Sequence, residues 1–490
     1  MAACFPGVAI GAAPTADGAS QTLAAVEALL DPGPSRSPDA ARGSGAGTGP
    51  AAARSVTLLL RRLDRVLPQL ERPERRRARS ILARPDRSGD GDYFGREAAG
   101  SPVCDGGVCV HWSRSRRAAP PGADATGDGI PDFVEQVAAA AARSHEVQNQ
   151  QLGWREPLPD GRQGARGKVG GSGQLDIYLS ELGNSVFGYA AVDPGSRGRR
   201  RPGYLVLDND YRGFKGDPLA LMQVTLAHEY NHILQFAYDV AADAWLFEST
   251  ATWMEEQVFP DVDDYIAFVR NFARAPAYPM AEPNGRRPVK IYGSAVWSHW
   301  LSSRYGPRVV RDAWDGVRGV EPSGSATAAF ERALGTGVSF SAEFTEFAAA
   351  TAEWSSDASF PDSALYPGVR RSKVSQGANE LIRGRLDHTG YALVNVRPGA
   401  GSELELTGKI EKGVSGGMAL VGRIGPRVGG EVVREVLHLP AGGRGKITLT
   451  DPARFDRVTA IGVNGDTSVD DRGRYTADGA RVKLKLEMRR

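Results

Sequence analysis

The sequence predicts an α+β fold followed by a small all-β domain at the C-terminus. Between residues 101 and 372, a few short strand patterns are followed by a run of longer helical patterns. Strands and helices that are segregated in this way are typical of α+β proteins, whereas a doubly wound sheet alternates them. From about residue 380, short apolar runs are separated by Gly, Pro, Asp and Asn, which indicates a β-sandwich over 380–490.

Each element is recognised by its apolar spacing. In the α+β region the strand candidates are 175–179 and 204–207, and the helix candidates are 131–151, 217–238, 245–258, 262–273, 293–304 and 342–354. In the C-terminal region the strand candidates are 391–396, 403–406, 418–421, 432–439, 446–449, 458–463 and 482–488.

The first hundred residues differ in character from the rest. Residues 1–54 are interpreted as a leader and a flexible, disordered segment, because 14–53 are rich in Ala, Gly, Pro and Ser. Met1 to Ala13 is apolar but lacks the basic start of a signal peptide, so it is either a leader truncated at its beginning or a disordered terminus, and we favour the leader. Residues 55–100 carry apolar residues at helical spacing. This helical segment is either a propeptide or an integral part of the protein, and the sequence leaves both open.

Composition excludes several classes of protein. A net charge of +2 indicates no polyanionic partner, and the local arginine runs are typical of a solvated surface, so we expect no nucleic-acid binding. The sequence contains no apolar stretch long enough to cross a bilayer. It gives no indication of oligomeric state.

Cysteine usage points to a small disulfide loop. Cys104 and Cys109 are separated by Asp-Gly-Gly-Val, a turn-forming sequence that brings two strand ends together. The alternative is two free thiols. The third cysteine, Cys4, lies in the leader, and without CxxC pairs we expect no cysteine-based zinc site.

The strongest chemical signal is the helical segment 217–236. Asp217 suits the N-cap and Pro218 the first helical position. His228 and His232 are four residues apart, so both imidazoles project from one side of the helix and can hold a zinc ion. Glu229 follows the first histidine and can act as a general base toward a water activated by the metal.

A catalytic zinc site requires a third protein ligand. A third histidine at metzincin spacing is excluded, because Gln235 and Tyr238 occupy the relevant positions. Glu248 lies one turn into an apolar helix, where a buried carboxylate needs a cation, and is our candidate. Glu255 and Glu256, farther along, are interpreted as solvated acids or as supports for the ligands. His111 and His299 are alternative ligands, although a histidine among tryptophans is more often packed.

Hydrolysis also requires a group that stabilises the developing oxyanion. Tyr292 is the first candidate because it precedes a helix rather than packing within one, and His299 and Tyr305 lie nearby. The competing interpretation of Tyr292 is a residue of the core.

A second cation site is predicted over residues 124–135. Its residues match the liganding positions of an EF-hand loop, with Gly129 at the sharp turn and Glu135 able to bind in a bidentate manner. The six predicted calcium ligands are Asp124, Thr126, Asp128, Ile130, Asp132 and Glu135. We expect the calcium to be structural. The alternative is a polar, glycine-rich turn.

Taken together, these motifs resemble a family of secreted bacterial zinc metalloproteases of the gluzincin type. The resemblance runs from about Val103 to Asp315 and is carried by the segments 109–112, 128–132, 175–178, 206–209, 225–239, 245–256 and 292–293. It implies a zincin fold, extracellular placement and peptidase activity. His232 and Glu248 are closer in sequence than the corresponding gluzincin ligands, which leaves Asp239 and Asp243 as alternative carboxylates. In zincins an edge strand lines the cleft above the metal helix, and we assign this role to 204–207.

The expected function is therefore zinc-dependent hydrolysis of peptide bonds by an extracellular endopeptidase that acts on proteins or peptides. An aminopeptidase is one alternative, although no acidic motif for a free amine stands out. The other is a secreted binding or adhesion protein with a structural or vestigial zinc site. The presence of Glu229 favours the enzyme, because a structural site has no use for a general base.

Overall fold

The computed structural model describes most of the chain. The described residues are 16–30, 56–87, 99–115, 118–160, 173–281, 290–317, 325–373, 381–382, 385–397, 401–470 and 474–489. Met1 to Ala13, with Cys4, lies outside them. The α+β class is confirmed, since both helices and sheets are present.

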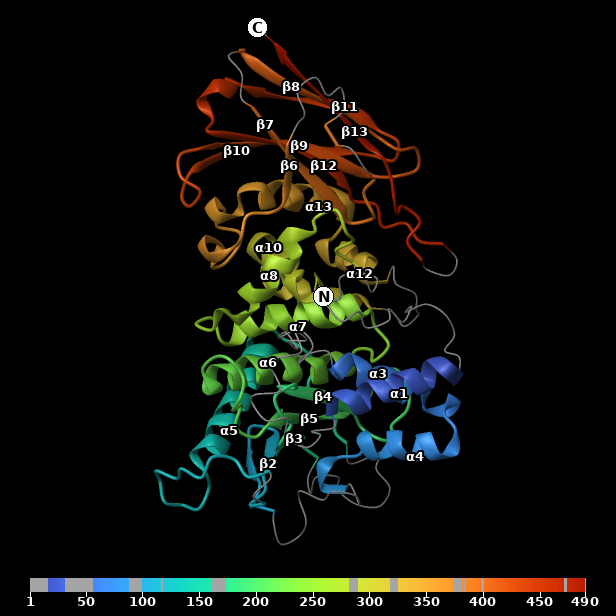
Figure 1. The fold of residues 1–490 in the computed structure, drawn as a ribbon, viewed down its shortest axis with the longest axis vertical. Coiled ribbons are helices and arrows are strands. Elements are labelled where there is room, and N and C mark those ends of the chain that lie inside the picture. Colours follow the sequence, from blue (N-terminus) through green and yellow to red (C-terminus); the bar gives the residue numbers. More distant parts are fainter. Residues whose placement is uncertain are drawn as a thin grey trace, which may run out of the picture. The chain divides into compact units, whose positions relative to one another are not determined.

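The chain divides into two compact units (Figure 1). Unit 1 contains the described residues up to Ala241 together with Met254–Val262, and unit 2 contains Ala242–Trp253 together with the residues from Asp263 onward. The expected domain boundary at 372–380 therefore falls inside unit 2. Helices that precede the β-domain in sequence belong to the same unit as its strands.

Unit 1 is built on a five-stranded sheet. Its strands are β1 (Val103–Asp105), β2 (Val108–His111), β3 (Leu175–Ser180), β4 (Gly188–Val192) and β5 (Gly203–Asp208), in the order β1-β2-β3-β5-β4. β2, β3 and β5 are parallel, whereas β1 and β4 pair antiparallel at the two edges. The β1–β2 hairpin carries the disulfide between Cys104 and Cys109 that the sequence suggested.

This order corrects the expected substrate strand. The predicted strand 204–207 is present as β5, but β5 pairs with β3 on one side and with β4 on the other. It therefore has no free backbone edge at which a peptide can add. The edge strand next to it is β4, whose residues are all buried and which was not among the predicted strands.

Helices cover both faces of this sheet. On one face lie α5 (Asp132–His145), the π-helical turn η4 (Glu146–Gln151) and α6 (Pro218–Phe236). α6 packs closely, because a Cβ added to Gly203 would meet Ile233 and Phe236. On the other face lie α1 (Ala16–Leu30), α3 (Val56–Val66) and α4 (Arg72–Ile81), with the turns η2 (Leu67–Gln69) and η3 (Pro85–Arg87).

The helix α1 is a second correction, because residues 16–30 belong to a segment expected to be disordered. Leu23 and Val26 of α1 are almost completely buried in one apolar cluster with α3, α4 and the sheet. The alanine-rich composition that suggested flexibility also has a high helix propensity, and tertiary packing decides between the two outcomes.

Unit 2 combines helices with a β-sandwich. Its first part is the N-terminal portion of α7 (Ala244–Val258). The following helices and turns are η6 (Asp263–Tyr265), α8 (Ile266–Arg274), α9 (Lys290–Gly293), α10 (Ala295–Tyr305), α11 (Arg308–Gly316), α12 (Ser325–Leu334), α13 (Phe340–Ala350), η7 (Thr351–Ser356) and η8 (Ser363–Leu365). Six helix candidates from the sequence are confirmed, in α5 with η4, α6, α7, α8, α10 and α13.

The sandwich consists of two sheets, ordered β10-β9-β12-β7-β6 and β11-β8-β13. The strands are β6 (Arg371–Lys373), β7 (Gly390–Val396), β8 (Glu403–Ile410), β9 (Gly416–Ile424), β10 (Glu431–Leu439), β11 (Arg444–Thr450), β12 (Arg457–Asn464) and β13 (Val482–Arg489), with the turn η9 (Pro452–Arg454). All seven predicted C-terminal strands are present as β7–β13. Their inward-facing residues form one apolar core.

Candidate metal centre

The histidine motif lies on α6, a helix with a well-defined start. The Oδ2 atom of Asp217 accepts a hydrogen bond from the backbone N–H of Ala220 at 3.1 Å, and Pro218 occupies the first turn, as predicted. From Leu221 to Phe236 almost every residue of α6 is buried. The motif therefore lies inside the protein, where charged and polar groups need partners.

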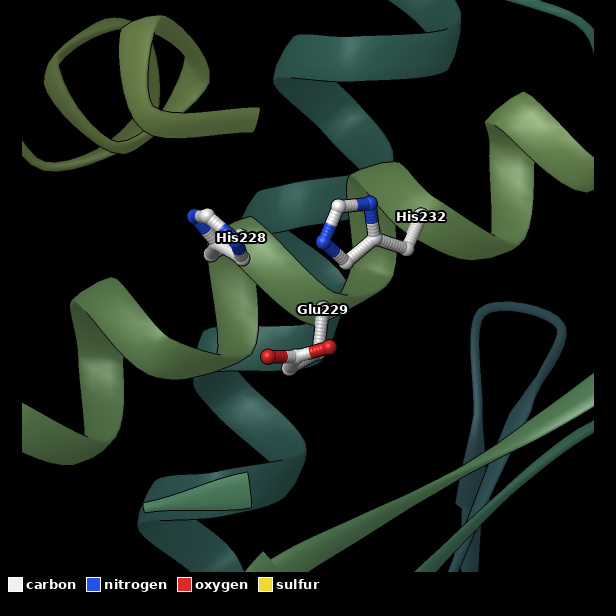
Figure 2. Close-up of side chains that lie close together, drawn as sticks. All are labelled: His228, Glu229 and His232. Atoms are coloured by element: carbon white, nitrogen blue, oxygen red, sulfur yellow. The ribbon is translucent and has the colours of Figure 1, made fainter. Parts of the chain in front are cut away.

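His228, Glu229 and His232 form a compact group (Figure 2). One potential ligand atom from each lies within 4.8 Å of the others, and all three side chains are buried. The two imidazole rings are 4.7 Å apart between centroids and nearly perpendicular. The i, i+4 spacing thus produces the convergence that the sequence predicted.

His228 is oriented by a carboxylate. Its Nδ1 atom lies 2.7 Å from Oε1 of Glu255, near the end of α7, and both side chains are buried. A carboxylate oxygen accepts hydrogen bonds, so Nδ1 carries the proton and Nε2 keeps its lone pair in the neutral imidazole. Of the two functions that the sequence left open for Glu255, the structure favours support of a ligand.

His232 is oriented by a chain of side-chain amides. Its Nδ1 atom lies 2.7 Å from Oε1 of Gln235. Nε2 of Gln235 donates to Oδ1 of Asn231 at 2.6 Å. Nδ2 of Asn231 donates to Oε1 of Gln148 at 3.0 Å, and Nε2 of Gln148 donates to the carbonyl of Ala227 at 3.0 Å.

The hydrogen bond between Gln148 and Ala227 fixes the orientation of every amide in this series. The carbonyl of Ala227 can only accept, so Gln148 must present its NH₂ there and its oxygen to Asn231. Asn231 and Gln235 are oriented in the same way, so Oε1 of Gln235 faces Nδ1 of His232. Nδ1 is therefore protonated, and Nε2 of His232 also keeps its lone pair.

These residues fit a zinc ion. Two imidazoles that project from one helix, each with Nδ1 directed at an oxygen acceptor, are the donor set and the supporting shell that zinc sites use. His228 and His232 could hold the ion through Nε2, with Glu229 beside it.

Glu229 has a hydrogen-bond donor of its own. Its Oε2 atom accepts from the hydroxyl of Thr57 at 2.8 Å, and Thr57 Oγ1 accepts from the backbone N–H of Ala190 in β4 at 2.9 Å. Both side chains are buried. A residue of the N-terminal helical segment thus contacts the candidate general base.

The two remaining residues of the predicted centre lie in unit 2. Glu248 is completely buried in α7. Tyr292 is 1% exposed and lies 5.2 Å from the ring of Phe268, which favours the core interpretation of this tyrosine. Both assignments stay predictions.

The alternative histidines have other environments. Nε2 of His111 lies 2.7 Å from Oδ1 of Asp176, and its ring stacks on Tyr178. His299 is buried against Tyr265, and burial lowers the pKa of its imidazole to about 3, so the ring is neutral. Both are packed histidines.

The alternative carboxylates also have other partners. Asp239 forms an ion pair with Arg199. Asp243 accepts a hydrogen bond from the backbone N–H of Trp245 at 2.7 Å and so helps to start α7.

The predicted calcium loop is an exposed turn before α5. Asp124 accepts hydrogen bonds from the backbone N–H groups of Gly127 at 2.7 Å and Gly129 at 2.9 Å, which lower the pKa of its carboxyl. Asp128 accepts from Ile130 N, and Asp132 from Ala125 N. Among the described residues, these acids are not part of a group whose ligand oxygens lie within 4.8 Å of one another. Calcium binding stays a prediction.

Comparison with known proteins gives no family: no protein-family model matches the chain. No curated protein matches it either. In the described part of the chain, no helix is both long and apolar enough to span a membrane. Of the residues around the metal centre, the sequence analysis did not identify Thr57, Gln148 or Asn231. Asn231 lies within the motif, whereas Thr57 and Gln148 are distant in sequence and carry no motif.

Proposed function

We propose that this protein is a zinc-dependent endopeptidase. The observation that carries the proposal is the orientation of the two histidines on one helix, because each Nδ1 faces an oxygen acceptor, as it does in histidines that bind a metal through Nε2. A buried glutamate beside them favours catalysis over a purely structural zinc site. When bound, Zn²⁺ supplies a Lewis acid that lowers the pKa of water to about 7.

The protein's own residues perform the remaining steps. Glu229 takes a proton from the attacking water and later transfers it to the leaving amine. Tyr292 remains the candidate for stabilising the oxyanion.

Glu248 is the proposed third ligand. Its carboxylate is completely buried in α7, where a charged group needs a cation.

Extracellular placement is part of the proposal. The Cys104–Cys109 disulfide supports it, because disulfides persist mainly in oxidising compartments. Structural calcium at residues 124–135 is proposed as well, on the sequence pattern alone.

The test compares wild type with Glu229→Gln for bound zinc and for cleavage of casein and of N-acetylated fluorogenic peptides. We expect equal zinc content and a loss of cleavage of about 10²- to 10⁴-fold in the variant. Glu146→Gln, an exposed glutamate of η4, is the control and should cleave normally. Cleavage restricted to peptides with a free amine would indicate an aminopeptidase. Bound zinc without cleavage in either protein would favour a binding function.

A further inference from the structure

Thr57 lies between the candidate general base and β4, the edge strand of the sheet. It is the second residue of α3 and is completely buried. Its hydroxyl contacts Glu229 Oε2 at 2.8 Å and the N–H of Ala190 at 2.9 Å. In this way one side chain connects the N-terminal segment, the metal helix and β4.

The direction of these hydrogen bonds is fixed. The N–H of Ala190 can only donate, so the Thr57 oxygen accepts there and the single hydroxyl proton is directed at Glu229. Oε2 of Glu229 is therefore engaged as an acceptor, and Oε1 is the oxygen left to take up a proton. The carboxylate is held in one orientation relative to the histidines.

The Ala190 N–H points away from the sheet. In the antiparallel pair β4–β5, Asp208 N donates to Phe187 O and Asp193 N donates to Pro202 O, so the odd-numbered residues of β4 make the hydrogen bonds to β5. The backbone N–H and C=O groups of the even-numbered residues, Ala190 among them, point away from β5. Thr57 thus fixes the edge strand as well as the base.

The segment that carries Thr57 is firmly attached to unit 1. Arg84, 1% exposed, contacts three buried aspartates, Asp160, Asp176 and Asp193. Arg61 donates twice to the carbonyl of Val240, at 2.9 and 2.8 Å.

Apolar contacts add to these polar ones. α1, α3 and α4 share one buried cluster with β3, β4 and β5, in which Leu60, Leu63 and Tyr204 are at most 1% exposed. Removal of the segment would expose a face of the sheet and leave three carboxylates without their arginine. Such an extensive interface favours an integral part over a removable propeptide.

We infer that Thr57 is a positioning residue for Glu229, and that residues 56–87 are retained in the active enzyme. The inference rests on the proposed peptidase function. It favours an integral part over a propeptide, and it gives the N-terminal segment a function in orienting the candidate general base.

The test compares Thr57→Val, which removes the hydroxyl at nearly constant volume, with Thr57→Ser, which keeps it. With fluorogenic peptides, we expect Thr57→Val to lower kcat about 10- to 100-fold at little change in KM and with zinc content unchanged. Thr57→Ser should recover the lost rate. Thr22→Val is the matched control, because Thr22 is buried in the neighbouring helix α1 but its hydroxyl donates to Gly18 O in its own helix. It should behave as wild type.

Three results would overturn the inference. One is full activity in Thr57→Val while Glu229→Gln is inactive, which leaves the peptidase function standing. Another is increased activity in Thr57→Val, or an active species that mass spectrometry shows to lack residues 56–87, since either indicates an inhibitory propeptide. The third is wild type that does not cleave peptides at all, in which case the proposed function fails first.

Discussion

Glu255 accepts a hydrogen bond from Nδ1 of His228 at 2.7 Å, and both side chains are almost completely buried. The carboxylate orients the imidazole and increases its basicity toward a metal at Nε2. The carboxylate thereby contributes to metal binding without being a ligand itself.

Replacing Glu255 by Gln should therefore weaken zinc binding while the fold is retained. Glutamine keeps an oxygen that can accept from Nδ1 but loses the charge, so we expect about 10- to 100-fold lower zinc affinity. Competition with a chromophoric chelator measures the zinc affinity of the variant and of the wild type. Asp261→Asn, an exposed carboxylate six residues later, should leave the affinity unchanged. Equal affinity in Glu255→Gln and wild type would show that Glu255 does not tune the metal ligand.

Gln148→Leu should disrupt the amide chain that orients His232. Asn231 would lose its acceptor inside the protein, and an unsatisfied buried polar group costs about 1–3 kcal/mol. We expect a lower free energy of unfolding by urea and weaker zinc binding in the same variant. Gln151→Leu, on the exposed side of the same π-helical turn, serves as the control. The network has no orienting function if Gln148→Leu loses stability but binds zinc with unchanged affinity.

Arg84→Met should destabilise the protein strongly at neutral pH. It leaves Asp160, Asp176 and Asp193 buried without the arginine that contacts all three, and removal of one partner of a buried ion pair costs about 3–5 kcal/mol. Urea unfolding at pH 7.5 measures the effect. The exposed Arg79→Met of α4 is the matched control. Equal stability of the two variants would contradict the proposal that Arg84 compensates the charge of the three buried aspartates.

The effect of Arg84→Met should also depend on pH. Burial raises the pKa of the Asp160 carboxyl from 3.8 to about 6, although Arg84 opposes the shift. A raised pKa in the folded state contributes stability that is present below about pH 4 and is lost as the pH rises through about 6. Without Arg84 the pKa should rise further. The gap in unfolding free energy between Arg84→Met and wild type should therefore be smaller at pH 5 than at pH 7.5, and an equal gap at both would argue against buried aspartates as its cause.

Much of the secondary structure could be predicted from periodicity. The apolar spacing located α6 and α7 to within a residue or two, and the seven short runs after residue 380 all became strands. These signals are local, since a helix or a half-buried strand shows its buried face in its own sequence. β4 was not predicted because Gly188–Val192 is short and most of its side chains are small. α1 was not predicted because an alanine-rich helix has a composition similar to that of a flexible linker.

The candidate site could be predicted only in part, for the same reason. His228, Glu229 and His232 are set by the i, i+4 geometry of one helix. Thr57 and Gln148 reach them from other elements, and no local pattern marks a threonine or a glutamine that will face a metal site. Their positions follow from tertiary packing, which a single sequence does not display.

The contact between Thr57 and Glu229 joins residues 172 positions apart. Closing so long a loop is entropically costly, and such contacts form after local helices have formed. During synthesis, α3 leaves the ribosome long before α6 and the end of α7 exist. The candidate centre therefore assembles late in folding, after residue 255 has emerged and α3 has docked. A nascent or partly folded chain, lacking the oriented histidines, would bind zinc weakly and pose little hazard to the proteins around it.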